Sequence, residues 1–181
     1  MDDHQCFTAI QQGTPQARRA AVDCLYQRYA AEFFKYLQRH RVIPQDAQDI
    51  LHDTFLRLLE PLPSPIPHPK PYLYRMLINR AKEFWAQEAM AARRKVPIDS
   101  WIEQVDSSPL PLTQATVQSA GEAFAAFARD HPDPGIALEL TLLEGWNMKE
   151  LAQFLGKNEG ATREYISCWR KKFRQDYLRL D

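Results

Sequence analysis

The side chains best suited to chemistry gather near the end of the chain, where cationic residues are concentrated on one segment. From Arg163 to Arg174 there are five basic residues and a single acidic one. Guanidinium and ammonium groups bind phosphate, and a well-placed arginine also hydrogen-bonds the edge of a guanine base. This composition indicates that the segment binds a polyanion.

Two short helices joined by a tight turn must position these cations. Asn147 and Glu150 have the spacing of a capping box, which predicts a helix that ends near Leu155. Gly156 suits a turn with positive φ, and Asn158 suits the cap of a second helix. The inward positions of that helix are Thr162, Ile166, Trp169 and Phe173. The pattern predicts a helix-turn-helix.

The second helix of such a motif lies in the major groove of DNA. Its outward residues here are Glu159, Ala161, Arg163, Glu164, Ser167, Arg170 and Lys171. Arg163 is placed to read guanine or hold phosphate, whereas Arg170, Lys171, Lys172 and Arg174 are better placed for phosphate. An ordinary surface helix with a basic C-terminal end is the alternative, but charge and spacing together favour duplex DNA binding.

A second candidate surface is acidic. Pro44 opens a predicted helix on which Asp46, Asp49 and Asp53 lie opposite an apolar stripe. Alone, acids near a helix N-terminus are ordinary stabilisers. A helical enzyme that uses these carboxylates with a metal is a rival hypothesis, but no partner base or set of metal ligands accompanies them. We therefore predict no catalytic residue, no metal and no cofactor.

A third candidate surface lies on a helix expected to begin at Tyr72 and to end near Arg94. Its positions outside the apolar stripe are Tyr72, Tyr74, Arg75, Asn79, Lys82 and Trp85. Aromatic rings among cations suit single-stranded DNA, although the rings serve equally well to fill a core. The alternating prolines from Pro61 to Pro71 predict an extended loop before this helix.

Composition and patterning predict an all-α, non-membrane protein. The 181 residues carry no net charge, 45% are hydrophobic, and strand signals are nearly absent. We expect two small helical domains, 1–96 and 113–181, joined by an acidic linker at 97–112 that contains proline and serine. A turn is expected at His131–Pro134. The acidic start argues against a secretory signal, so we expect a cytoplasmic protein.

The three cysteines, Cys6, Cys24 and Cys168, are far apart in the sequence and form no Cys-x-x-Cys pair. This spacing argues against a disulfide framework and against a zinc knuckle. Buried or idle thiols are the expected state.

Taken together, these segments resemble the small sigma factors of the extracytoplasmic-function (ECF) group. Leu25–Tyr29 and Asp46–Leu58 are similar to the region that binds core RNA polymerase. Tyr72–Met76, with Asn79 and Ala81, is similar to the promoter-melting helix. Glu144–Ala152 and Gly160–Phe173 are similar to the helix-turn-helix of the family. Departures from the family pattern are Gln48, Ile78, Tyr165, Cys168 and Trp169.

The resemblance implies a non-catalytic transcription factor that initiates transcription at promoters. It implies that Asp46, Gln48, Asp49 and Asp53 contact the clamp helices of core RNA polymerase. It also implies that Tyr72, Tyr74, Arg75, Asn79 and Lys82 hold melted promoter DNA, and that the C-terminal domain reads duplex DNA and rests on the polymerase flap. Control by an anti-sigma factor stays open, as does a form that has lost polymerase activation.

A stand-alone helix-turn-helix regulator with an N-terminal helical sensing domain is the main alternative. It would explain the segment from Asn147 to Phe173, and it would bind duplex DNA without polymerase, as a dimer on a palindrome. It would not explain the acidic helix followed by the Tyr72 helix.

Overall fold

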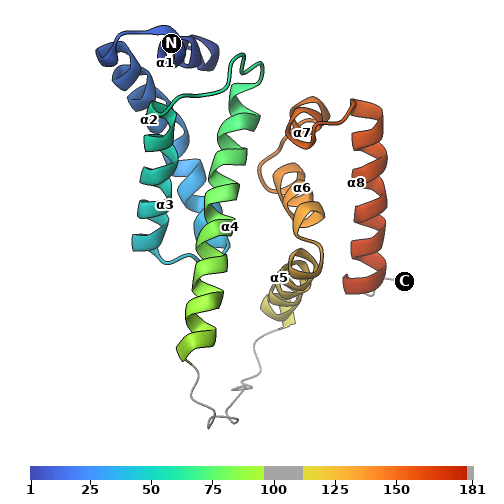
Figure 1. Ribbon diagram of the computed structural model, residues 1–181. Helices are drawn as coiled ribbons and strands as arrows, with labels where there is room; N and C mark the ends of the chain where they lie inside the picture. The colour runs from blue at the N-terminus through green and yellow to red at the C-terminus, as the bar shows by residue number, and fades with distance from the viewer. Residues whose placement is uncertain (96–111, 179–181) are drawn as a thin grey trace. The chain divides into compact units, whose positions relative to one another are not determined.

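Every regular element is helical in the described part of the computed structural model, residues 1–95 and 112–178 (Figure 1). The predicted all-α class is therefore confirmed. The chain divides into two compact units, Met1–Ser100 and Trp101–Asp181. The predicted linker at 97–112 falls outside the described residues, except for Leu112, which begins a helix.

The first unit contains α1 (Asp3–Gln12), α2 (Pro15–Arg39), α3 (Pro44–Leu56), the 3-10 turn η1 (Arg57–Leu59) and α4 (Pro69–Lys95). Thr14 caps α2 as predicted, because its hydroxyl accepts a hydrogen bond from the Ala17 N–H at 3.3 Å. Pro44 occupies the first turn of α3, also as predicted. We did not predict α1, although Asp2 and Gln5 form a reciprocal capping box at its start.

Phe33 occupies the centre of the first unit, with no exposed surface. Its ring lies 5.6 Å from Tyr29 of the same helix, 6.0 Å from Phe55 of α3 and 4.9 Å from Tyr74 of α4. Aromatic pairs at these separations are stabilising beyond the area they bury. The Phe33 ring thus joins the three longest helices of the unit and fixes which face of α3 and of α4 remains outside.

The second unit contains α5 (Leu112–Asp130), α6 (Pro132–Leu142), α7 (Met148–Leu155), α8 (Glu159–Phe173) and the π-helical turn η2 (Arg174–Leu178). Phe127 of α5 is fully buried at its centre. Its ring contacts Phe173 at 5.2 Å, Tyr177 at 5.3 Å and Trp169 at 6.1 Å. The inward aromatic residues of α8 and η2 therefore pack on α5, so the opposite side of α8 faces outward.

Two segments were predicted as non-helical because of their prolines, and both predictions are wrong where the segments end, because a helix has already begun there. The loop expected to run to Pro71 ends earlier, since Pro69 begins α4 and Pro71 lies in its first turn. The turn expected at His131–Pro134 is also wrong, because α6 begins at Pro132. The first N–H groups of a helix have no partner within the helix, so a proline there removes no hydrogen bond.

In the described residues, no helix combines the length and the apolar character that a bilayer-crossing segment needs.

The crossing of α5 and α6 depends on Gly135. A Cβ atom at this position would lie 2.8 Å from Ala128 Cα and 2.9 Å from Ala128 Cβ, which is too close for either helix to accept without moving. Gly121 of α5 is the matched control, because a Cβ there meets nothing within 4 Å.

We predict that Gly135→Ala destabilises the second unit by about 1–3 kcal/mol, the usual range for overpacking. Gly121→Ala should instead raise its stability by about 0.5–1 kcal/mol, because alanine is the better helix former. Urea unfolding followed by tryptophan fluorescence measures both changes. Equal effects of the two substitutions would contradict the close approach at Gly135.

Candidate nucleic-acid interface

The helix-turn-helix predicted from Asn147 to Phe173 is present as α7, a short turn and α8. Asn147 and Glu150 form the expected capping box, with reciprocal hydrogen bonds of 2.9 and 3.0 Å. Gly156 ends α7 with φ of 67°, a left-handed conformation that favours glycine. The Asn158 side chain then accepts a hydrogen bond from the Ala161 N–H at 2.8 Å and caps α8.

The inner face of α8 is anchored as its sequence predicted. Thr162 and Ile166 are buried, and the Thr162 hydroxyl donates a hydrogen bond to the Asn158 carbonyl at 2.8 Å. Trp169 lies between elements, with its ring 4.8 Å from His131 and 6.1 Å from Phe127. A large ring is accommodated at position 169 because it fills the space between α8 and the end of α5.

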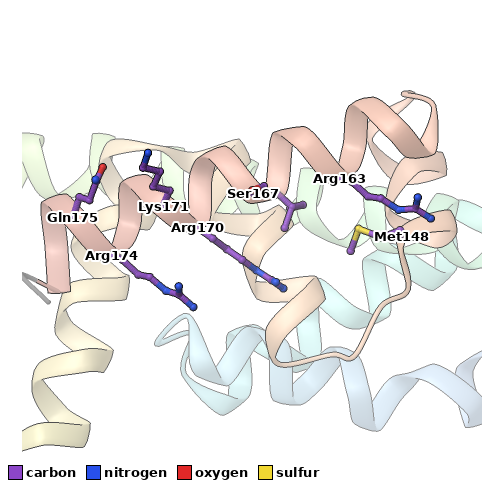
Figure 2. A pocket seen from close by; sticks show the side chains of 8 residues that line it. Met148, Arg163, Ser167, Arg170, Lys171, Arg174 and Gln175 are labelled. Carbon is purple, nitrogen blue, oxygen red and sulfur yellow. The ribbon is translucent and has the colours of Figure 1, made fainter. Parts of the chain in front are cut away.

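The outer face of α8 borders a cleft of about 660 Å³ in the second unit (Figure 2). Of the predicted duplex-binding residues, Arg163, Ser167, Arg170 and Lys171 line this cleft. Glu159, Ala161 and Glu164 are exposed but lie outside its lining. Sequence reasoning had not assigned two further lining residues, Met148 and Gln175. Met148 is the first residue of α7, directly after the Asn147 cap, and this position in the sequence could have indicated that it lies near the second helix of the motif.

Arginines dominate the electrostatics of this cleft. Arg163 and Arg170 of α8 and Arg174 of η2 all line it, and Figure 2 shows their three side chains extending from the same side of the ribbon. Arg163 has an ion pair with Glu159 at 3.6 Å, but both side chains are largely exposed, so water weakens this pair. In the described residues, the buried Nε of Arg170 has no hydrogen-bond partner. The cleft therefore presents cationic donors suited to phosphate.

Lys172 is an exception to the predicted cluster of phosphate-binding cations. Its ammonium lies 5.7 Å from the centre of the Trp169 ring and 3.8 Å from the Asp176 carboxylate. It does not line the cleft. Lys172 therefore lies apart from the cleft that Arg170 and Lys171 line, and its contact with phosphate stays a prediction.

The four candidate residues on the acidic side of α3 differ in their exposure and in their contacts. Gln48 and Asp49 are exposed, and Asp46 is half-buried in the first turn of the helix. Asp53 is held within the unit, because Arg80 of α4 forms an ion pair with it and another with Glu83 at 2.9 Å. These two carboxylates raise the pKa of Arg80, and the hydrogen bond to Asp53 makes the largest contribution. Asp53 therefore links α3 to α4.

The candidate strand-binding side of α4 includes one incorrect prediction. Arg75, Asn79 and Lys82 are exposed, as expected for positions outside the apolar stripe. Tyr74 has no exposed surface, and its hydroxyl donates a hydrogen bond to the Glu32 carboxylate of α2. The predicted outward position of Tyr74 is wrong, because α4 packs against both α1 and α3 and buries a wider face than one stripe.

Two other aromatic residues of α4 are half-buried. The Tyr72 ring meets Phe7 of α1 edge-on at 5.9 Å, and burial raises the pKa of its phenol. Trp85 lies 5.4 Å from the His40 ring at the end of α2. Each ring therefore has one side in the fold and a remaining edge that is accessible.

Within the part of the chain that the structure describes, no three His, Cys, Asp or Glu side chains group closely enough to hold a metal ion. Asp46, Asp49 and Asp53 therefore do not form such a group. Their arrangement offers a charged surface to a partner.

Residues 25–90 match the family model described as Sigma-70 region 2. The match begins within α2, includes α3 and ends within α4, so it contains both candidate surfaces of the first unit. This segment is similar to sigma-70 region 2. Among curated proteins, none matches the chain. The helix-turn-helix lies outside the matched range.

Sigma-70 region 2 binds core RNA polymerase and promoter DNA, which supports a role for this chain in transcription initiation. Sigma-70 factors act by binding and are not enzymes, in agreement with the prediction that the protein is not an enzyme. The acidic side of α3 and the polar side of α4 lie within this matched segment.

We predict that Arg170→Ala weakens the non-specific binding of the chain to duplex DNA and lowers the slope of log affinity against log salt by about 1, the value expected for one lost phosphate contact. Lys172→Ala is the matched control, because it removes the same charge from the adjacent position outside the cleft. Fluorescence anisotropy of a labelled duplex across a salt series measures both. Indistinguishable slopes for the two variants would contradict the assignment of the cleft.

Proposed function

We propose that the chain is an ECF-type sigma factor that binds core RNA polymerase, recognises a promoter and initiates transcription. The observation that carries the proposal is that one chain contains two different candidate DNA-binding segments in the order found in sigma factors. A segment similar to sigma-70 region 2 lies at 25–90, and a helix-turn-helix with a cationic outer face follows it at 148–173. A stand-alone regulator accounts for only the second of these.

Core binding is assigned to the exposed end of the acidic side of α3. Gln48 and Asp49 are the principal contacts to the clamp helices, since both side chains are exposed on α3. Asp46 adds negative charge beside them. Asp53 acts mainly by joining α3 to α4 through Arg80, which keeps the acidic side and the DNA-facing side of one domain in register.

Melted promoter DNA is assigned to the exposed side of α4. Arg75, Asn79 and Lys82 project from successive turns and offer cationic and amide groups to a single strand. The accessible edges of Tyr72 and Trp85 are suited to stack on unpaired bases. Tyr74 contributes indirectly, because its buried ring and hydroxyl hold α4 against α2.

Duplex promoter DNA is assigned to the cleft along α8. Arg163 reads a base, while Arg170, Lys171 and Arg174 bind phosphate. A second contact to polymerase is assigned to Leu142 and Leu143 at the end of α6, which are 52% and 60% exposed and suited to the flap. With both units tethered to polymerase, their DNA contacts become intramolecular and affinity rises without additional contacts.

We predict that Asp49→Lys weakens binding to core RNA polymerase at least about tenfold, because charge reversal at an interface opposes docking and leaves the fold unchanged. The measurement is co-elution of the chain with sigma-free core polymerase on gel filtration, with helicity checked by circular dichroism. Glu88→Lys is the control, since it reverses an exposed acid on α4 and leaves α3 unchanged.

The result expected is a stable wild-type complex that survives Glu88→Lys and is lost in Asp49→Lys. If the wild-type chain forms no complex and instead binds duplex DNA alone as a dimer, the stand-alone regulator becomes the correct function. If Asp49→Lys binds as the wild type does, the docking surface is elsewhere.

We predict that Arg163→Ala lowers promoter affinity by about 1–3 kcal/mol while core binding is preserved, because a base contact is lost and α3 is untouched. Footprinting of the polymerase complex on its promoter measures the first effect, and gel filtration measures the second. Ser167→Ala, which changes a neutral neighbour in the same cleft, is the comparison variant. An unchanged footprint in Arg163→Ala would rule out this residue as a reader.

A further inference from the structure

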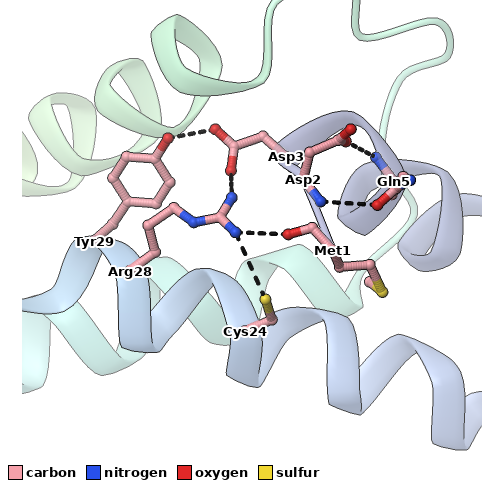
Figure 3. Close-up of polar contacts among 7 residues, drawn as sticks. All are labelled: Met1, Asp2, Asp3, Gln5, Cys24, Arg28 and Tyr29. Carbon is pink, nitrogen blue, oxygen red and sulfur yellow. Dashed lines mark hydrogen bonds and ion pairs between the residues drawn. The ribbon is translucent and has the colours of Figure 1, made fainter.

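Two cysteines that are distant in the sequence lie opposite each other on α1 and α2. The two helices are joined by only Gly13 and Thr14, so they run in opposite directions. Asp3 at the start of α1 pairs with Arg28 and accepts a hydrogen bond from Tyr29 on α2 (Figure 3). One turn further along α1 is Cys6, and one turn back along α2 is Cys24. The register thus places the two thiols at one level of the interface.

The two thiols have different access to solvent. Cys6 is fully buried, and Cys24 is half-buried. Burial raises the pKa of the Cys6 thiol to about 11, and a hydrogen bond to the Cys24 side chain contributes to this rise. This influence of Cys24 on Cys6 agrees with the helix register, which brings the two side chains together. A dissolved oxidant therefore meets Cys24 first, with Cys6 behind it.

A cation lies beside the more accessible thiol. The Arg28 guanidinium donates to the Met1 carbonyl at 2.6 Å, and the same nitrogen lies 4.0 Å from Cys24 Sγ (Figure 3). A positive charge at this distance offsets the negative charge that sulfur carries during nucleophilic attack. Asp3 fixes the position of the guanidinium through its other arm.

We propose that Cys6 and Cys24 form a dithiol that hydrogen peroxide oxidises to an intramolecular disulfide. Cys24 sulfur, as the thiolate, attacks one oxygen of the peroxide, so that the O–O bond breaks, hydroxide leaves and Cys24 becomes a sulfenic acid. Cys6 sulfur then attacks the Cys24 sulfur, forming the S–S bond as the S–O bond breaks. The Cys6 proton and the departing hydroxide leave as water. In total, two thiols and one peroxide give one disulfide and two waters.

The disulfide makes the docking of α1 covalent. In the reduced chain, α1 is held by the burial of Cys6, Phe7 and Ile10 and by the Asp3 contacts. From its far end, the Gln11 amide donates a hydrogen bond to the Pro63 carbonyl at 2.9 Å, in the proline-rich loop before α4. Oxidation therefore fixes the helix that holds this loop.

The third cysteine is removed so that it does not compete for the oxidant. Cys168 is exposed on α8 in the second unit. A non-selective oxidation would consume Cys168 first, or would join two chains through it. Its replacement by serine therefore leaves Cys6 and Cys24 as the thiols that can react.

The experiment treats the reduced full-length Cys168→Ser variant with equimolar hydrogen peroxide. Thiols are then titrated in denaturant, and the peptides are analysed by mass spectrometry without reduction. We expect both thiols to be lost and a linked peptide pair containing Cys6 and Cys24, lighter by two hydrogen atoms. In Cys6→Ala, a sulfenic acid at Cys24 should persist and be trapped by dimedone. In Cys24→Ser, the Cys6 thiol should survive.

The rate of disulfide formation provides a second readout. The pKa of Cys6 is raised, so its reactive thiolate is scarce at neutral pH. As the pH rises toward that pKa, the thiolate fraction increases about tenfold for each pH unit. The second step, followed after rapid formation of the sulfenic acid, should accelerate accordingly between neutral and alkaline pH. Two titratable thiols after peroxide, or only disulfides that join separate chains, would overturn the proposal.

Discussion

The arrangement of both functional surfaces of the first unit depends on the buried ring of Phe33. Its contacts to Phe55 and Tyr74 set the rotation of α3 and α4 about their own axes. Once the apolar stripe of α3 faces Phe33, its acids must face solvent. The same contact turns Tyr74 inward and leaves Arg75, Asn79 and Lys82 outside. The ion pair between Asp53 and Arg80 then joins the two helices at their surface.

Phe127 has the corresponding role in the second unit. It gathers Trp169, Phe173 and Tyr177 on one side of α8 and η2, so that Arg163, Arg170 and Arg174 must share the other side. The hydrogen bond from Tyr177 to Asp130, 2.6 Å long, closes the end of this cluster and raises the pKa of Tyr177 to about 12. A cleft lined by cations is a consequence of where the aromatic residues pack.

The sequence was sufficient for the helix-turn-helix, because Asn147, Gly156 and Asn158 determine their local structure through hydrogen bonds and a positive φ within a few residues. Patterns that depend on distant partners were harder to interpret. The sequence does not show that Glu32 of α2 accepts a hydrogen bond from the Tyr74 hydroxyl, which allows this ring to be buried. It also does not show that the packing of α1 on α2 brings Cys6 close to Cys24. Prolines at 69 and 132 misled us, because their effect depends on whether they begin a helix or interrupt one.

The central claim is that both units act on one promoter only when they are bound to polymerase. The most direct test is transcription in vitro from fragmented genomic DNA, with core polymerase alone, the chain alone and both together. We expect transcripts with discrete 5′ ends only in the combined reaction, and permanganate-reactive thymines just upstream of those ends. Sequence-specific protection of duplex DNA by the chain alone, with no new transcripts when core polymerase is added, would contradict this account.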